Sequence, residues 1–85
     1  MPTIIRIGGL RVVIYPNDHR PAHVHVMRDG CEAVLILNCP DGPPTLRDSI
    51  GFKAHELGPI IDALAPKAQM TTACDKWSAI HGPHN

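Results

Sequence analysis

Short apolar runs separated by glycine-containing turns are the feature that most constrains how this chain can fold. Residues 3–7 are rich in β-branched side chains, and Gly8-Gly9 separates them from a second apolar run. This pattern predicts a β-hairpin, because tight hairpin turns need positive φ angles, which glycine adopts at the least cost. Asp29-Gly30 predicts a second hairpin turn between two further runs. We therefore expect a four-stranded antiparallel meander, with strands at residues 3–7, 10–15, 23–27 and 32–38.

The rest of the chain changes character, first to a loop and then to helices. Residues 39–51 contain three prolines and two glycines. We predict a Pro/Gly loop there, because proline cannot donate a hydrogen bond to a sheet ladder. Between Leu57 and Leu64 the apolar residues follow the i, i+3, i+4, i+7 spacing of a helix. We place the start of this helix at residues 55–58, because Pro59 lacks an N–H group and suits only a first turn. A second helix is predicted over residues 67–80.

These elements fit one small domain of the α+β class. Eighty-five residues is the size of a single domain, and we assign residues 1–85 to it. The sheet is expected at residues 1–38, the loop at 39–51 and the helical part at 52–82. A sheet with one apolar face must be covered, and two helices can cover it. We therefore predict a four-stranded antiparallel meander packed on one face by two short C-terminal helices.

The charge balance excludes a strongly basic protein. Eight Lys and Arg residues face eight Asp and Glu residues, so the formal net charge is zero. The overall positive field typical of nucleic-acid binders is therefore absent. A local basic patch remains compatible with the sequence, because four arginines lie in the N-terminal third: Arg6, Arg11, Arg20 and Arg28.

The cysteines and the apolar runs predict a cytoplasmic protein. Cys31, Cys39 and Cys74 are odd in number and form no C-x-x-C pair, so we expect three reduced thiols. The N-terminus has no long apolar region typical of a signal peptide. No apolar run approaches the length of a membrane span, and no membrane association is expected.

Residues 17–27, NDHRPAHVHVM, concentrate three of the six histidines in seven positions. Because side chains alternate along a strand, His23 and His25 should share one face, while Val24 and Val26 point to the core. The histidines are then expected to point outward or into a groove. If neighbouring strands are in register, Arg11 and Tyr15 should lie beside them.

One interpretation of this histidine strand is a metal site. His23 and His25, two residues apart on a strand, can converge on one ion, with His19 or Asp18 as the third ligand. The residue types suit a divalent transition metal such as Zn²⁺, and the site would then serve a Zn-binding domain or a small metal-dependent hydrolase. H-x-H alone is a weak signal, because no cysteine or carboxylate stands at a diagnostic spacing.

A second interpretation is acid–base catalysis. Cleaving RNA through its own 2′-OH needs a base, an acid and a cation, and His23, His25 and Arg20 are the right types. A third is a binding surface for nucleic acid or a protein, and a fourth is the solvated face of a strand. The sequence leaves all four open, together with the oligomeric state. The expected binding residues are Arg11, Tyr15, His19 and Arg28.

The C-terminal end carries two further expectations. His81 and His84 lie in a glycine- and proline-containing tail, IHGPHN, which we expect to be frayed. Trp77 lies on an apolar helix face and is expected in the core rather than at a binding surface.

The motifs PTIIRIGGLRVVIY and NDHRPAHVHV resemble those of a small bacterial family, domain of unknown function 4160. The resemblance continues with Gly51-Phe52, Glu56-Leu57 and Trp77, and it covers most of the chain. Pro59, Pro66 and the proline-rich stretch 39–45 depart from the more continuous helices of such proteins. The departure bears on the helix boundaries and not on the N-terminal sheet.

The resemblance implies a gene neighbourhood and does not identify a reaction. Genes of this family often lie beside a second small gene, an arrangement that looks like a toxin–antitoxin pair. It implies one component of such a two-gene module, acting through a His/Arg surface on RNA or on a small protein partner encoded next to it. Metal binding or metal-dependent hydrolysis is the alternative.

Overall fold

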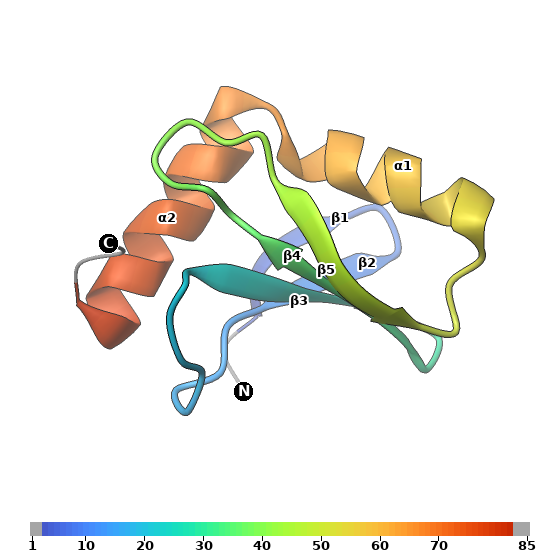
Figure 1. Cartoon of the computed structure of the whole chain (residues 1–85), viewed down its shortest axis with the longest axis horizontal. Coiled ribbons are helices and arrows are strands. Elements are labelled where there is room, and N and C mark those ends of the chain that lie inside the picture. Colours follow the sequence, from blue (N-terminus) through green and yellow to red (C-terminus); the bar gives the residue numbers. More distant parts are fainter. Residues whose placement is uncertain (1–2, 83–85) are drawn as a thin grey trace.

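The structure, a computed structural model, describes residues 3–82 as an antiparallel sheet followed by two helices (Figure 1). The strands follow one another in space in the order of the sequence, β1-β2-β3-β4-β5. The α+β class, the antiparallel meander and the two C-terminal helices are confirmed. The elements are β1 (Thr3–Ile7), β2 (Leu10–Val13), β3 (His23–Arg28), β4 (Cys31–Ile36), β5 (Thr45–Ile50), α1 (Ala54–Leu64) and α2 (Lys67–His81).

The sheet has five strands, so the prediction of four was wrong. β5 lies inside the stretch 39–51, which was predicted to be a loop, and it pairs antiparallel with β4. The prolines of that stretch, at positions 40, 43 and 44, all precede the strand and leave its ladder intact. β5 is an edge strand whose side chains are nearly all exposed. An exposed edge strand needs no apolar alternation, so the usual sequence signal is missing.

Helix α1 begins at Ala54, one residue before the predicted range, and Pro59 lies in its second turn rather than its first. The start is fixed by Glu56, whose carboxylate accepts a hydrogen bond of 2.9 Å from the backbone N–H of Lys53. Such a contact satisfies an N–H that has no partner within the helix. Pro59 and His55, which would have shared the missing backbone bond, are both exposed, so water can replace it.

Both helices contribute to a core on one side of the sheet. Val24 and Val26 are 0% and 1% exposed, as the alternation along β3 predicted. In Figure 1, α1 runs along the sheet, while α2 closes the end of the sheet at which β3 begins. Trp77 is completely buried, which confirms its predicted core position. From the helices the core receives Ile60, Leu64, Met70, Ala73, Cys74 and Trp77. Neither helix within residues 3–82 combines the length and the apolar character needed to cross a membrane.

A disulfide bond joins Cys39 to Cys74, so the prediction of three reduced thiols was wrong. An odd number of cysteines leaves one thiol unpaired but does not prevent the other two from bonding. The fold brings Cys39, just after β4, next to α2, with 6.0 Å between the two Cα atoms. That separation lies in the usual range for a bridge. Cys31, half-buried, is the free cysteine.

We predict that replacing both bridged cysteines, as Cys39→Ser/Cys74→Ser, lowers the free energy of unfolding by about 2–4 kcal/mol. The reason is that the bridge closes a loop of 35 residues and so constrains the unfolded chain. Urea denaturation measures the change. Thiol titration of unfolded, unreduced wild-type protein should find one free thiol, and Cys31→Ser, the matched control, should find none. Three free thiols in the wild type would contradict the bridge.

Candidate functional site

A tight turn at the end of β2 positions the carboxylate of Asp18. The backbone N–H of Asp18 donates to the carbonyl of Tyr15 at 3.1 Å, which closes a four-residue turn. In return, the backbone N–H of Tyr15 donates to Oδ2 of Asp18 at 3.0 Å. Pro16 occupies the second position of the turn, where its fixed φ is favourable. The carboxylate is thereby held over the first residues of β3, with its side chain only 13% exposed.

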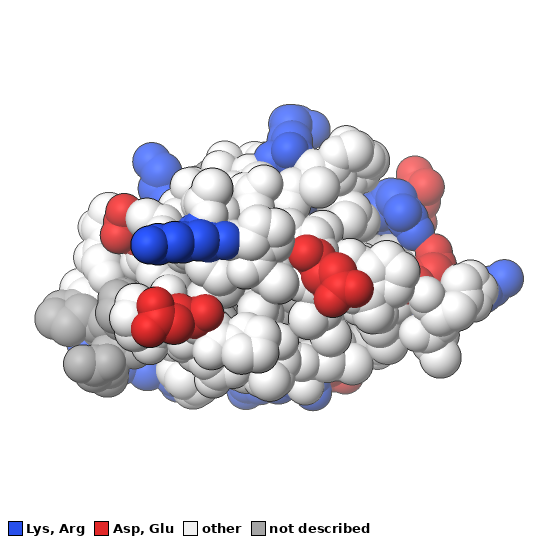
Figure 2. All heavy atoms as spheres, turned by 90° about the horizontal axis from the view of Figure 1, so that it is seen from above, with Lys and Arg blue, Asp and Glu red and all other residues white. Residues whose placement is uncertain are grey.

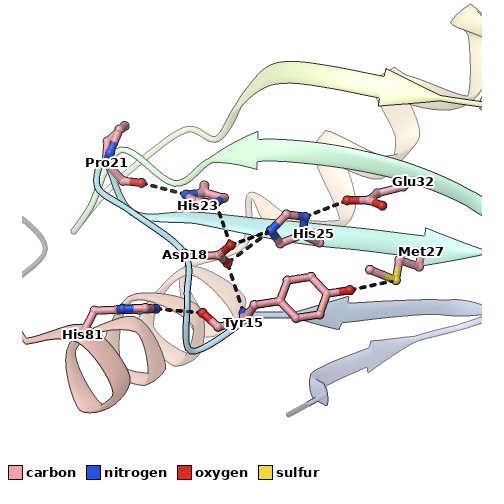
Figure 3. Close-up of polar contacts among 8 residues, drawn as sticks. All are labelled: Tyr15, Asp18, Pro21, His23, His25, Met27, Glu32 and His81. Atoms are coloured by element: carbon pink, nitrogen blue, oxygen red, sulfur yellow. Dashed lines mark hydrogen bonds and ion pairs between the residues drawn. The ribbon is translucent and has the colours of Figure 1, made fainter. Parts of the chain in front are cut away.

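Two histidines of β3 turn the same ring nitrogen toward this carboxylate (Figure 3). Nδ1 of His23 lies 2.8 Å from the carbonyl oxygen of Pro21, and Nδ1 of His25 lies 2.7 Å from Oε2 of Glu32. Both partners are acceptors, so each Nδ1 carries a proton. Each Nε2 is left to face Asp18. The distances from Nε2 to the nearest carboxylate oxygen are 3.5 Å for His23 and 3.1 Å for His25.

This geometry places acceptors against acceptors unless a cation lies among them. A neutral imidazole whose proton is on Nδ1 offers a lone pair at Nε2, and a carboxylate offers only lone pairs. The cluster is therefore satisfied either by additional protons on the imidazoles or by a metal ion. The ligand atoms of Asp18, His23 and His25 all lie within 4.8 Å of one another. Tetrahedral ligands at 2.0–2.1 Å from a zinc ion would be about 3.3 Å apart, close to the two distances between Nε2 and the carboxylate, 3.5 Å for His23 and 3.1 Å for His25.

Aromatic rings surround the cluster and connect it to α2. The ring centroids of His23 and His25 are 5.2 Å apart, and Tyr15 meets His25 edge-on at 4.7 Å. On the other side, Trp77 lies 5.3 Å from His23 and 4.1 Å from His81. These contacts fix the planes of both imidazoles, so the convergence on Asp18 is supported from two sides.

His81 was predicted to lie in a frayed tail, and this was wrong. It belongs to the last turn of α2, and its Nε2 lies 3.0 Å from the carbonyl oxygen of Tyr15. The stacking on Trp77 and this hydrogen bond hold the end of the helix against the turn that carries Asp18. His84, which shared the same prediction, lies outside the described residues.

His23 is far less exposed than the alternation along the strand suggested. Only 5% of its surface is accessible, although it lies on the face opposite to Val24. The strand alternates as predicted, but the Asp18 turn and the end of α2 cover this part of the face. The contacts of His23 are polar or aromatic, with Pro21, Asp18 and Trp77, so it is not a core residue surrounded by aliphatic side chains.

The cluster lies in a cleft of about 360 Å³. His19 and Arg20 are exposed on its rim, and the ligand atoms that converge do not include His19. The third converging ligand atom belongs instead to Asp18, which the sequence offered as the alternative to His19. The opposite side of the cleft is formed by Arg47 and Asp48 of β5. The lining comprises Asn17, Asp18, His19, Arg20, His23, His25, Val34, Arg47 and Asp48.

Three contributions were missed in the sequence. Arg47 and Asp48 were hidden because β5 was taken for a loop. Glu32 was assigned to a strand, but its role depends on which residue it faces across the sheet. In the structure Glu32 pairs with Met27, and His25 lies diagonally from it. Only the register of β3 with β4 reveals that contact, and the alternation of apolar and polar residues does not determine the register.

The predicted binding residues divide between two places. Tyr15 lies beside His25, as expected. Arg11 does not: it lies opposite Met27, and Val13 is the residue opposite His25. The alternation placed Arg11 on the correct face of the sheet, but its partner on β3 is Met27, two residues beyond His25. Arg28 forms an ion pair with Glu56 of α1 and lies over the ring of Phe52, so it connects the sheet to a helix.

Burial raises the pKa of the Tyr15 phenol above its usual value near 10. The negative charge of Glu32 acts in the same direction, and the positive charge of Arg11 opposes it. Because the folded protein disfavours the phenolate, Tyr15 contributes stability that is fully present below the pKa of the unfolded chain. That contribution is lost as the pH rises through the folded pKa.

We predict that Glu32→Gln lowers the pKa of Tyr15 toward its usual value in metal-free protein, because one of the charges that disfavour the phenolate is removed. The sequence contains a single tyrosine, so the near-ultraviolet absorbance of phenolate reports this residue alone. In Tyr15→Phe the stability loss at alkaline pH should be smaller than in the wild type. An identical phenolate titration in Glu32→Gln and wild type would show that Glu32 does not lie near Tyr15.

The comparison with protein families agrees with the sequence motifs. A family model described as domain of unknown function (DUF4160) matches residues 9–78. Neither the comparison with curated proteins nor that with solved structures gave a match. The matched stretch includes the Asp18 turn, both histidines of β3 and most of α2, so it contains the whole cluster described above. The chain therefore belongs to the family of domain of unknown function 4160.

Proposed function

We propose that Asp18, His23 and His25 bind a divalent transition metal and that the protein acts through this centre. The observation that carries the proposal is the orientation of the two imidazoles. Each holds its Nδ1 proton on an acceptor and turns Nε2 toward one carboxylate. A metal ion among these atoms would convert an arrangement of facing lone pairs into a set of metal–ligand bonds.

The groups behind the ligands support the same proposal. Histidines that bind metals almost always donate their other ring N–H to a carboxylate or a backbone carbonyl, which fixes the tautomer and raises the basicity of the ring. Glu32 would serve His25 in this way, and the Pro21 carbonyl would serve His23. Two imidazoles and one carboxylate suit Zn²⁺ or Fe²⁺ better than the hard cations Mg²⁺ or Ca²⁺, which prefer oxygen ligands.

Three protein ligands leave a coordination position for water or substrate, which is typical of catalytic rather than structural zinc. The cleft gives access to that position. A metal in such a site polarises a substrate oxygen and makes a bound water more acidic, and Arg20 and Arg47 at the rim would attract an anionic substrate. A small metal-dependent hydrolase is the enzyme class that these features support best.

We predict that protein purified without a histidine tag and loaded with Zn²⁺ binds one ion per chain, and that His25→Ala and Asp18→Asn lose binding by at least about a hundredfold. Asparagine retains an acceptor for the Tyr15 N–H, so the turn should persist while the charge is lost. Acidification should also weaken binding, because protons compete for the imidazole nitrogens. Competition with a chromophoric chelator measures the affinity, and elemental analysis measures the stoichiometry.

His19→Ala is the matched control for this experiment. It removes one imidazole from the same motif, but one that lies on the rim of the cleft, and its affinity for Zn²⁺ should stay within about threefold of the wild type. His55→Ala, on the exposed surface of α1, controls for general loss of imidazole. Equal losses in His19→Ala and His25→Ala would indicate adventitious binding and refute the assignment of ligands.

The second candidate is the role in a toxin–antitoxin-like module, in which the His/Arg surface acts on RNA or on a protein partner. The observation that favours it is the rim of the cleft, where His19, Arg20 and Arg47 are exposed around two less accessible imidazoles. In this case His23 and His25 exchange protons with a substrate, or the rim contacts a partner. No metal is then required.

We predict that, if this second role holds, chelator-treated protein still cleaves RNA and His25→Ala abolishes the cleavage while the fold persists. A pure binding role instead gives graded losses of partner affinity in Arg20→Ala and Arg47→Ala, without turnover. Expression with and without the neighbouring gene, scored by growth for the wild type and for His23→Ala/His25→Ala, measures the effect in cells. Growth unaffected by the wild-type protein under both conditions would argue against a toxin.

A further inference from the structure

A second cleft lies on the open face of the sheet, next to the metal-binding cluster but outside it. Its volume is also about 360 Å³. It is formed where the turn between β1 and β2 meets the turn between β3 and β4, and it is bordered by Gly9 and Gly30. Its charged lining consists of Arg6, Arg11, Arg28, Asp29 and Glu32.

Two of these arginines are placed unfavourably if nothing lies between them. Arg6 and Arg11 are direct partners across β1 and β2, so their side chains leave the same face of the sheet side by side. Like charges directly opposite each other in antiparallel strands destabilise the pair. Among residues 3–82, neither arginine forms an ion pair with a carboxylate, whereas Arg28 is paired with Glu56.

The carboxylates that line this cleft are not arranged to neutralise the arginine pair. Glu32 is held by its hydrogen bond to Nδ1 of His25. Asp29 is exposed in the β3–β4 turn, where its φ of 49° is set by the reversal of the chain. The other contact of Arg11 is with the sulfur of Met27, at 3.8 Å from Nη2, which does not balance a charge.

We propose that this cleft binds the phosphate group of a small phosphate ester of about nucleotide size, held by Arg6 and Arg11. Guanidinium groups match the oxygens of a phosphate and bind it through paired, charge-assisted hydrogen bonds. An anion between the two arginines would also remove their mutual repulsion. The volume lies near the lower end of the range of about 300–1,000 Å³ that is usual for small-molecule sites.

A single phosphorylated unit fits the charge distribution better than a long polyanion. The formal net charge of the chain is zero, and extended nucleic acids are usually bound by proteins with a broad basic surface. On the side where α1 lies, Figure 2 shows positive and negative side chains interspersed, without a continuous patch of one sign. Neither the net charge nor this side of the protein therefore offers the broad basic surface that a long polyanion needs.

This site is separate from the metal centre, although Glu32 borders both. The phosphate would be held by the β1–β2 hairpin, and the metal by the Asp18 turn and the first residues of β3. Binding of phosphate does not depend on Asp18, His23 or His25, so each assignment can fail without the other.

The experiment measures binding of inorganic phosphate and of a nucleoside 5′-monophosphate to chelator-treated protein, by calorimetry and by the shift in melting temperature. Compared with the wild type, Arg6→Gln/Arg11→Gln should lose at least about tenfold in affinity, since charge-assisted hydrogen bonds are removed. Lys67→Gln/Lys76→Gln, which removes two exposed positive charges from α2, is the matched control and should keep the wild-type affinity. Asp18→Asn should also keep it.

The fold of the variants is checked by the same data. Without phosphate, the double arginine variant should melt at or above the wild-type temperature, because the opposed charges are gone. Arg6→Gln alone, at an exposed position, serves if the double variant does not fold, and it should show a partial loss of affinity.

Three results would overturn the proposal. One is an equal phosphate affinity in the wild type and in Arg6→Gln/Arg11→Gln. Another is stabilisation by sodium chloride that equals that by phosphate at the same ionic strength, which would indicate screening alone. The third is binding of an RNA oligonucleotide that tightens with its length and far exceeds binding of the monophosphate, which would identify a polymer as the ligand.

Discussion

The carboxylate of Asp18, held between two imidazoles, is the interaction on which the open face of this protein depends. It exists because the turn after β2 returns the chain onto β3, and because the Tyr15 N–H fixes the carboxylate in that turn. The two imidazoles are themselves fixed from behind by an oxygen on each Nδ1. Because each Nδ1 already has its acceptor, the space among the Nε2 and Oδ atoms is a position where a cation improves the arrangement.

Helix α2 serves the core and the candidate site with the same residues. Trp77 is completely buried and belongs to the core, yet its ring also lies against His23. One turn later, His81 bonds to the backbone of the turn that carries Asp18. Cys74, one turn earlier, ties the helix to the connection between β4 and β5. A displacement of α2 would therefore disturb the packing and the imidazole geometry together, which couples global stability to the shape of the site.

The sequence was most informative where alternation and turn chemistry agree. Gly8-Gly9 and Asp29-Gly30 located two hairpins, and the alternation along β3 separated Val24 and Val26 from the histidines. It failed where the apolar pattern is absent and where a capping contact, rather than proline, sets the end of an element. β5 carries almost no apolar pattern because it is an exposed edge, and the start of α1 is set by a capping contact one turn before its proline.

The sequence predicted only some of the residues that form the candidate site. The motif NDHRPAHVHV indicated the two histidines, and it named Asp18 and His19 as equal alternatives for a third ligand. The choice between them depends on the path of the turn, which places Asp18 inward and His19 on the rim. Arg47 and Asp48 reach the cleft, and Glu32 reaches His25, only through the register of β3, β4 and β5. A one-residue slip would turn Glu32 to the other face, and the irregular pairing of β4 with β5 is what brings both Arg47 and Asp48 to the cleft.

A net charge of zero conceals an uneven distribution on the open face of the sheet. At one end Arg6 and Arg11 oppose each other, and at the other end the carboxylates of Asp18 and Glu32 lie against the two imidazoles. Each end carries a local electrostatic cost that an ion of opposite sign would relieve. Because such an ion binds the folded chain and not the unfolded one, it would raise the free energy of unfolding in proportion to the logarithm of its concentration above the dissociation constant. An anion acting at the hairpin end and a cation at the Asp18 end should then stabilise the protein additively, provided that Glu32, which lines the second cleft and bonds to His25, does not change partner when one of the two sites is filled.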